Sequence, residues 1–484
     1  MNYSDVKTLG DLRKTDYKSK PIKQEMRDNL IGFIKSGKSF SPEVLGYDDS
    51  VFPQLQNAVL ARHDFILLGL RGQGKSKLIK SLVNLLDEYI PVVEGSPLNE
   101  DPYVPILKRT KRLIDEKGDD TPVSWMHRSE RFSEKLATPD VSISDLIGDI
   151  DPIKASIEKL SFSDPDVIDF GLIPKANRCI FAINELADLQ PRIQVGLFNI
   201  MEEKSVQIKG FPVQFPLDSC LVYTANPEDY TARGSIITPL KDRIDSQIIT
   251  HYPITRSLGI DIVKQEVNSF YVSEYFHQIP KLVFELIEQI AIEARHSDLV
   301  DQASGVSARL SISAMENVIA FAEQRALKND ELFNIRVTDL YAAVPAITGK
   351  IELLYEGEQE GVITIAENLI SRAVRTLFEE YLPIEKEDSD FYQEVEALKS
   401  WFINHKLEIN DTTTNEEFLE AFRSVNSLEK LTKKHLEEMF STERLLAFGM
   451  QFILEGLVMT SHLSKFRSTG MLSYADMMGG MFSG

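Results

Sequence analysis

The sequence predicts an α/β fold built on a mainly parallel sheet, followed along the chain by a helical region. Four short apolar runs bounded by polar turns predict buried strands, at residues 65–68, 90–93, 179–183 and 220–224. Segments of helical periodicity lie between them, at residues 75–88 and 192–203. Because strands that helices cover on both faces are apolar throughout, this alternation favours a parallel sheet. After about residue 261 no strand pattern appears, which predicts helices only.

Five regions are expected along the 484 residues. Residues 1–40 form a basic arm with a helix at 21–36, and residues 41–255 form the α/β domain. A stretch rich in Pro, Asp, Lys and Arg at about 95–140 is interpreted as an insertion in that domain. Residues 256–355 and 356–467 form two helical regions, and residues 468–484, rich in Gly, Met and Ser, form a flexible tail.

Composition and charge restrict the classes of function. The formal net charge of −21 disfavours non-specific binding to nucleic acid or to an anionic membrane. The two cysteines, Cys179 and Cys220, lie in apolar runs, which argues against a disulfide scaffold and favours the reducing cytoplasm. We expect no signal peptide and no membrane span, because the first residues are polar and no run of about 18 apolar residues occurs.

The strongest motif is the run Gly69-Leu-Arg-Gly-Gln-Gly-Lys-Ser76, which matches GxxxxGK[ST] between an apolar strand and a helix. Glycines let the backbone N–H groups point at phosphate oxygens, and the helix N-terminus adds positive charge there. Lys75 is expected to reach the β- and γ-phosphates and Ser76 to ligate Mg²⁺; a chance glycine-rich turn is the alternative. The residues expected to bind the nucleotide are Gly69, Arg71, Gly72, Gln73, Gly74, Lys75, Ser76 and Lys77.

A second motif ends the apolar run at 179–183 with Asn184 and Glu185. The usual pair at such a position is Asp-Glu, in which the Asp holds Mg²⁺ and the Glu polarises the attacking water. Glu185 keeps the second role. Asn184 can accept a hydrogen bond from a metal-bound water or from Ser76 but brings no charge, so weaker metal binding is expected. The alternative is a strand that ends in a polar turn.

Three further residues are candidates for catalysis. Asn226, after the run at 220–224, would orient the attacking water, although Asn before Pro is also a common turn. Arg243 would stabilise the charge that develops in phosphoryl transfer, with a surface Asp/Arg pair as the alternative. Arg309, at the start of a helix in the second region, would bridge lid and nucleotide or would be an ordinary exposed arginine.

The order of these motifs resembles the AAA+ ATPases, and within them the magnesium chelatase subunit I and MoxR clade. The stretches that carry the resemblance are residues 44–48, 171–178, 202–216 leading into 223–227, and 305–309. The resemblance, over about residues 40–350, implies that residues 202–216 form a hairpin and residues 256–355 a lid. It assigns Lys75 and Ser76 to Walker A, Asn184 and Glu185 to Walker B, Asn226 to sensor 1, Arg243 to the arginine finger and Arg309 to sensor 2.

The resemblance also implies ATP and Mg²⁺ as ligands and a homo-oligomeric ring, expected to be a hexamer, that remodels a partner protein. A separate von Willebrand A domain protein is the expected partner, since the DxSxS match at Asp140, Ser142 and Ser144 follows no apolar strand. The hairpin tip at 209–211 would contact a partner or substrate, or would be a plain surface hairpin with one exposed Phe. Three alternatives stay open: a genuine magnesium chelatase subunit, a hydrolysis-weak nucleotide-dependent scaffold, and a DNA-associated AAA+ protein.

Overall fold

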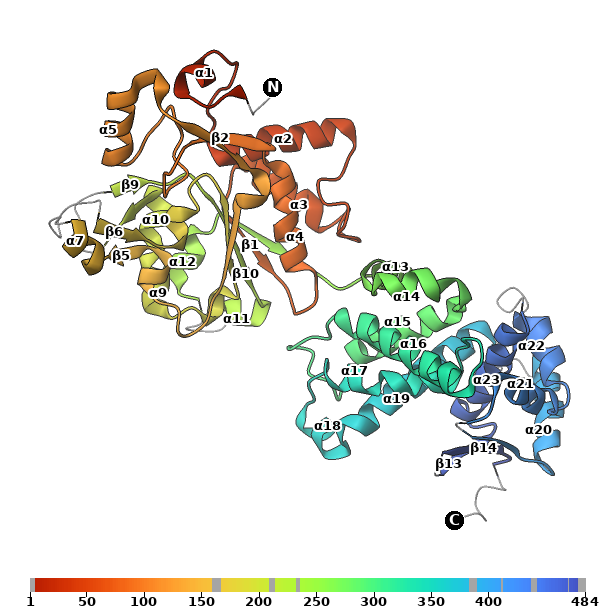
Figure 1. Ribbon diagram of the computed structural model, residues 1–484. Coiled ribbons are helices and arrows are strands. Elements are labelled where there is room, and N and C mark those ends of the chain that lie inside the picture. The colour runs from red at the N-terminus through yellow and green to blue at the C-terminus, as the bar shows by residue number, and fades with distance from the viewer. Residues whose placement is uncertain are drawn as a thin grey trace. The chain divides into compact units, whose positions relative to one another are not determined.

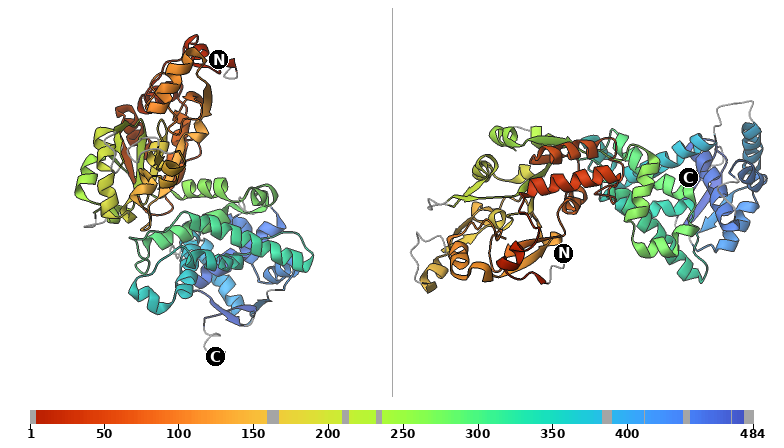
Figure 2. Two further views of the ribbon diagram at one scale, coloured as in Figure 1. Left: turned by 60° about the vertical axis from the view of Figure 1, so that its left-hand side comes forward. Right: turned by 90° about the horizontal axis from the view of Figure 1, so that it is seen from above.

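The computed structural model describes residues 5–158, 167–208, 214–231, 236–382, 390–410, 412–436, 442–468 and 470–477. The chain divides into two compact units, Met1–His251 and Tyr252–Gly484 (Figure 1). The first unit contains a sheet with helices on both faces, and the second is mostly helical; Figure 2 shows each from two further directions.

The centre of the first unit is a five-stranded sheet in the order β11-β1-β10-β7-β4. Every pairing in it is parallel. The predicted fold class, an α/β core with a parallel sheet followed by a helical region, is therefore confirmed. The strands are β1 (Phe65–Leu68), β4 (Phe132–Leu136), β7 (Ile180–Asn184), β10 (Cys220–Ala225) and β11 (Ser246–Ile249).

Alternating residues of the central strands enter two separate apolar clusters, one on each face of the sheet. Phe65 and Leu67 pack with α2 (Ile22–Ser36), α3 (Val51–Ala61) and α4 (Lys75–Ser81). Ile66 and Leu68 belong to the other cluster. That cluster includes side chains from α9 (Pro191–Gly196), α10 (Phe198–Glu203) and α12 (Thr238–Arg243). The helix expected in the N-terminal arm, α2, thus lies in the core of the first unit, capped at its start by Pro21.

Two expectations for the first unit, one about a strand and one about an insertion, differ in part from the structure. The run at 90–93 forms β2 (Tyr89–Val93), but β2 pairs antiparallel with β3 (Val123–His127) and not with the main sheet. The stretch at 95–140, interpreted as an insertion, contains the edge strand β4 of the main sheet. The sequence of β4, FSEKL, is polar because an edge strand is only partly covered, so no apolar run marks it.

The predicted helices at 75–88 and 192–203 are shorter than expected. The first ends as α4 at Ser81 and continues as a 3₁₀ helix, Leu82–Leu85. The second divides at Leu197 into α9 and α10. The remaining helices of this unit are α1 (Leu9–Arg13), α5 (Lys108–Lys117), α6 (Ile143–Leu146), α7 (Pro152–Glu158), α8 (Leu172–Lys175) and α11 (Pro227–Thr231).

Two further antiparallel ribbons complete the first unit. One pairs β5 (Gly148–Ile150) with β6 (Ile168–Phe170). The other pairs β8 (Ser205–Gln207) with β9 (Gln214–Pro216), as the expected hairpin requires. The tip expected at 209–211 lies outside the described residues.

One apolar cluster runs through the second unit from Ile260 to Tyr474, across both expected helical regions. Its long helix α19 lies against both α15 and α23. The helices are α13 (Arg256–Glu266), α14 (Ser269–Glu274), α15 (Lys281–His296), α16 (Arg309–Asn329), α17 (Val344–Thr348), α18 (Tyr355–Glu360), α19 (Val362–Tyr381), α20 (Asp390–Phe402), α21 (Asn415–Arg423), α22 (Leu428–Leu436) and α23 (Glu443–Met459).

The prediction of helices only after residue 261 was wrong. An antiparallel sheet in the order β12-β14-β13 joins β12 (Leu407–Asn410), β13 (Ser464–Ser468) and β14 (Met471–Ala475). β14 lies inside the stretch expected to be a flexible tail, and residues 478–484 of that stretch lie outside the described ones. Within the described ranges, no helix combines the length and apolarity needed to span a bilayer.

Candidate nucleotide-binding site

The glycine-rich loop follows β1 at the edge of the sheet where the parallel strands end. Gly72 and Gly74 have φ of 74° and 75°, a backbone conformation that residues with a Cβ rarely adopt. Gly74 caps the start of α4. At Gly69 a Cβ would lie 1.8 Å from Thr250 Oγ1 and 2.3 Å from Gln73 Oε1, so only glycine fits there. The loop therefore curls tightly into the helix N-terminus, as a phosphate cradle requires.

A set of residues behind the loop fixes its shape. Thr250 Oγ1 donates to Gln73 Oε1 at 2.7 Å, and Thr250 N donates to Leu68 O at 2.8 Å. The Tyr47 hydroxyl donates to the carbonyl of Gln73, and its oxygen lies 3.1 Å from the carbonyl oxygen of His251. The predicted role of Gln73 as a nucleotide contact is thus joined by a structural one. The sequence motifs did not predict a role for Thr250 or His251, and Tyr47 was indicated only by the family resemblance at residues 44–48.

Lys75 and Ser76 occupy the positions that phosphate binding requires. The Lys75 side chain is buried, and its Nζ donates to the Gly69 carbonyl and, at 3.4 Å, to the Leu70 carbonyl. Burial lowers the pKa of Lys75, and the charges of Glu185 and Asp229 oppose that shift. Ser76 is exposed in the first turn of α4. The ammonium is thus held inside the loop by neutral carbonyl oxygens, which a phosphate oxygen would replace.

The end of β7 brings Glu185 to the same edge. Glu185 has φ of 54°, and its backbone N–H donates to Thr224 Oγ1 of β10 at 2.9 Å. Burial raises the pKa of Glu185, while the charge of Lys75 acts in the opposite direction. The two side chains are therefore near enough to influence each other's proton affinity, which the expected nucleotide site requires.

The two asparagines lie at the ends of neighbouring strands. Asn184 Nδ2 donates to Glu134 Oε2 at 3.3 Å, and Asn184 Oδ1 accepts from Thr224 Oγ1 at 3.4 Å. Asn226 follows β10, and its Nδ2 donates to Asp229 Oδ2 at 3.3 Å. Glu134 and Asp229 are acidic groups that sequence reasoning missed. Nothing in a single sequence pairs a polar edge strand with Asn184.

The two predicted arginines have other surroundings within their own units. Arg243 Nη2 and Nε donate to Glu202 Oε2 at 2.7 and 3.0 Å, and its guanidinium lies over the Phe198 ring, 4.7 Å from the ring centroid. Arg309 opens α16 in the second unit, where its side chain is exposed. Arg71 is exposed and Lys77 is half-buried at the loop. The first unit therefore gathers Lys75, Ser76, Asn184, Glu185 and Asn226, while Arg243 pairs with Glu202.

The residues at this edge fit a nucleotide with Mg²⁺. The loop offers glycine backbone, a buried ammonium and an exposed hydroxyl, which are the groups that a triphosphate and its metal take. Among the described side chains, no group of three or more His, Cys, Asp or Glu could hold a metal by itself. Mg²⁺ in nucleotide sites commonly uses one or two carboxylates together with phosphate oxygens and water, so the phosphates would supply most of its ligands.

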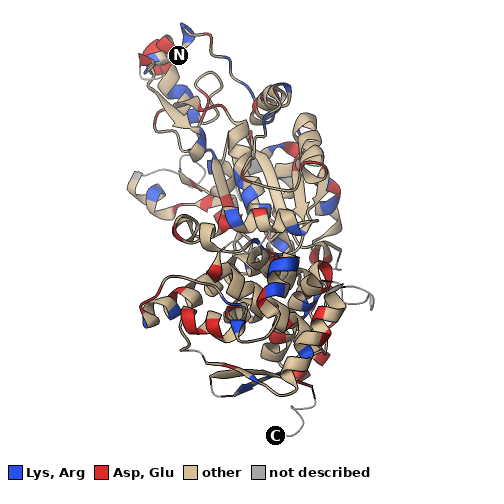
Figure 3. Ribbon diagram, turned by 90° about the vertical axis from the view of Figure 1, so that its right-hand side faces the viewer, with Lys and Arg blue, Asp and Glu red and all other residues tan. Residues whose placement is uncertain are grey.

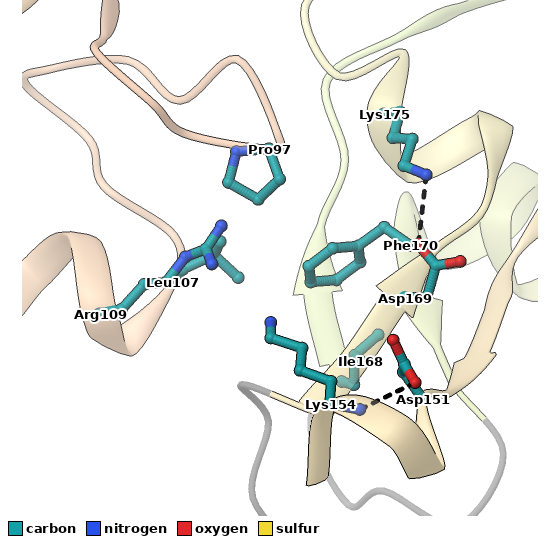
Figure 4. A pocket seen from close by; sticks show the side chains of 9 residues that line it. All are labelled: Pro97, Leu107, Arg109, Asp151, Lys154, Ile168, Asp169, Phe170 and Lys175. Atoms are coloured by element: carbon teal, nitrogen blue, oxygen red, sulfur yellow. Dashed lines mark hydrogen bonds and ion pairs between the residues drawn. The ribbon is translucent and has the colours of Figure 1, made fainter. Parts of the chain in front are cut away.

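A separate cavity of about 180 Å³ lies between the loop before α5 and the β6 strand (Figure 4). Arg109, Lys154 and Lys175 bring positive charge to it and Asp151 and Asp169 negative charge, with Lys175 Nζ 3.3 Å from Asp169 Oδ1. None of the residues predicted for the nucleotide site lines it. Elsewhere in both units Asp and Glu lie along the helices beside scattered Lys and Arg (Figure 3).

No family model and no curated protein matches the chain. Solved structures similar to it include NtrX from Brucella abortus, with 12% identity, 76% of this chain and 72% of that chain covered, and a TM-score of 0.40. The complex of the magnesium chelatase subunits BchI and BchD has 18% identity, with 66% of this chain and 98% of that chain covered and a TM-score of 0.35. A Thermotoga maritima RuvB mutant has 12% identity, with 92% and 89% covered and a TM-score of 0.31. At such TM-scores these similarities do not bear on function.

Proposed function

We propose that this protein is an AAA+ ATPase that binds and hydrolyses ATP with Mg²⁺. The observation that supports it most is a loop with two positive-φ glycines that leads from β1 into α4 at the carboxyl end of a parallel sheet and holds the buried Lys75 ammonium against its own carbonyl oxygens. A GxxxxGK[ST] run between a buried strand and a helix is the structural context that makes the motif specific.

Each residue has a role that its position supports. Backbone N–H groups of residues 69–76 and Lys75 bind the β- and γ-phosphates, and Ser76 with Asn184 holds the hydrated Mg²⁺. Bound Mg²⁺ neutralises charge on the phosphate oxygens. Glu185 accepts a hydrogen bond from the attacking water and orients it, and Asn226 holds that water from the neighbouring strand.

A ring of identical subunits would complete the site. Arg243 of one copy would reach the nucleotide of the next, and Arg309 would close over the nucleotide of its own chain. Arg243 is held here by Glu202, whose side chain is 63% exposed, and an ion pair that accessible is worth little energy and exchanges readily. A hexamer of magnesium chelatase subunit I or MoxR type in the cytoplasm, remodelling a von Willebrand A domain partner, follows from the sequence resemblance.

A second candidate is a nucleotide-dependent scaffold that hydrolyses ATP weakly. Asn184 favours it, because an uncharged amide at this position weakens the hold on Mg²⁺. Comparing phosphate release by the native chain with that by Asn184→Asp separates the two. A scaffold gains activity from the change, whereas an ATPase already hydrolyses at a rate that depends on protein concentration, as ring assembly requires.

The direct test of the proposal is Lys75→Ala. Calorimetry with ATP and Mg²⁺ should show binding to the native chain and a loss of at least about 100-fold in affinity for the variant, since a buried charged contact to phosphate is removed. Lys175→Ala, which removes an exposed lysine paired with Asp169, is the matched control and should bind as the native chain does. Equal affinity of Lys75→Ala and the native chain would refute the proposal.

A further inference from the structure

Asn184 stands where a negatively charged residue is expected next to the Mg²⁺ of the proposed site. An Mg²⁺ bound to a triphosphate commonly has a carboxylate near it, directly or through water, and Asn184 is neutral. The register of the sheet shows which side chains share a face with Asn184. In β4, Leu136 is the partner of Asn184 and Glu134 the partner of Ala182, two residues earlier in β7. Because side chains alternate along a strand, Glu134 and Asn184 lie on the same face of the sheet.

That face is the one that α4 covers. Ala182 packs in the same apolar cluster as Leu78 and Ile79 of α4. Lys80 of α4 forms an ion pair with Glu134, with Nζ 2.9 Å from Oε1. Lys80 follows Ser76 by four residues, so the two lie on one side of the helix, about one turn apart. Glu134 is therefore paired with the side of α4 that carries Ser76, through the lysine one helical turn after it.

The two oxygens of Glu134 have different partners. Oε1 faces Lys80, and Oε2 accepts from Asn184 Nδ2 at 3.3 Å. The amide of Asn184 is itself fixed from the other side, because its Oδ1 accepts from Thr224 Oγ1. The carboxylate is 37% exposed, so water reaches it. An aspartate at 184 would repel Glu134, whereas the asparagine binds it.

We propose that Glu134 supplies the negative charge that Asn184 lacks, acting through water on the Mg²⁺ of the proposed nucleotide site, with Asn184 as the residue that positions it. The inference rests on the proposed function. Lys80 then competes with the metal for the same carboxylate. If the Glu134–Lys80 pair were purely structural, removing either partner would leave the affinity for Mg²⁺ unchanged.

The test measures how strongly Mg²⁺ enhances nucleotide binding, using titration of a fluorescent ADP analogue with and without the metal. Glu134→Gln should weaken the affinity for Mg²⁺ about 10-fold, as loss of a group behind a metal ligand commonly does, and leave metal-free nucleotide affinity unchanged. Lys80→Met should instead strengthen the affinity for Mg²⁺. Asp169→Asn, which removes another lysine-paired carboxylate from an edge strand, is the matched control and should have no effect.

Restoring the charge at the neighbouring position gives a second measurement. In an Asn184→Asp background, Glu134→Gln should lower the affinity for Mg²⁺ by less than 3-fold, because the aspartate carries the charge itself. The inference is overturned if the affinity for Mg²⁺ stays within 2-fold in Glu134→Gln, or if it falls in both Glu134→Gln and Lys80→Met. In either case, nucleotide binding by the native chain still supports the proposed function. Absence of nucleotide binding by the native chain, with or without metal, is instead a failure of the proposed function and removes the basis of the inference.

Discussion

Buried charged side chains have different partners at the two ends of the parallel strands in the main sheet. At the edge where the strands begin, Arg131 donates to both oxygens of Glu25, at 2.6 and 2.8 Å, and both side chains are buried. Asp64, also buried, pairs with Lys23 and with Lys204, each at 2.6 Å. At the edge where the strands end, the buried ammonium of Lys75 donates to backbone carbonyls and not to a carboxylate.

This difference separates the residues that stabilise the first unit from those that bind a ligand. Burial raises the pKa of Glu185 and lowers that of Lys75, so each charge lacks full compensation in the protein alone. Groups placed in this way commonly lower stability and gain a partner when a ligand binds. Changes at the strand ends should therefore alter chemistry, and changes at the strand starts should alter folding.

The largest effect is expected at Glu185. Glu185→Gln keeps the shape of the side chain and removes the group that orients water, so ATP hydrolysis should fall by about 10²–10⁴-fold. The free energy of unfolding should stay the same or rise, because a half-buried charge is lost. Phosphate release and thermal unfolding check the two halves, and a drop in stability would contradict the comparison of the two edges.

The opposite edge is tested with Arg131→Met. Removing the arginine leaves the Glu25 carboxylate buried with the backbone N–H of Asp87 but without its charged partner, which costs about 3–5 kcal/mol of unfolding free energy. Urea unfolding measures the loss. Nucleotide affinity of the folded variant, measured at low temperature, should remain within about 3-fold of the native value. The double variant Glu25→Leu with Arg131→Met serves as the control, since it removes both charges and should recover most of the stability.

A smaller effect is expected in the pH dependence of hydrolysis. Burial raises the pKa of Glu185 above its ordinary value of 4.5. As pH falls through that raised pKa, the carboxylate gains a proton and can no longer polarise water, so the acid limb of kcat/KM should lie above pH 4.5. Asn184→Asp should move that limb to still higher pH, because a second carboxylate disfavours ionisation of the first. A limb at or below 4.5 would show that Glu185 is not the titrating base.

Much of the site was accessible from the sequence because its parts are local. The run at 69–76 and the strand ends at Asn184 and Asn226 each carry their signal within about ten residues, and a parallel sheet brings strand ends together. The helix at 21–36 was predicted to within one residue, because Pro21 and Gly37 mark its two ends.

The remainder depends on pairings between distant segments. β4 is polar and pairs with β7, about fifty residues later, so neither its sequence nor its neighbours reveal it. β12 and β14 are more than sixty residues apart. Thr250, directly after β11, holds Gln73, which lies far earlier in the chain. Such contacts leave no short-range pattern, and a single sequence gives no other signal for them.

The C-terminal sheet has a practical consequence for anyone who shortens this chain. β14, at residues 471–475, lies between β12 and β13 and pairs with both. Trimming the chain at residue 470, as its glycine- and methionine-rich composition invites, removes the middle strand. Two open strand edges would then face solvent, and such edges recruit other chains into aggregates. A cut after residue 477 keeps the strand, and purification handles are better attached there.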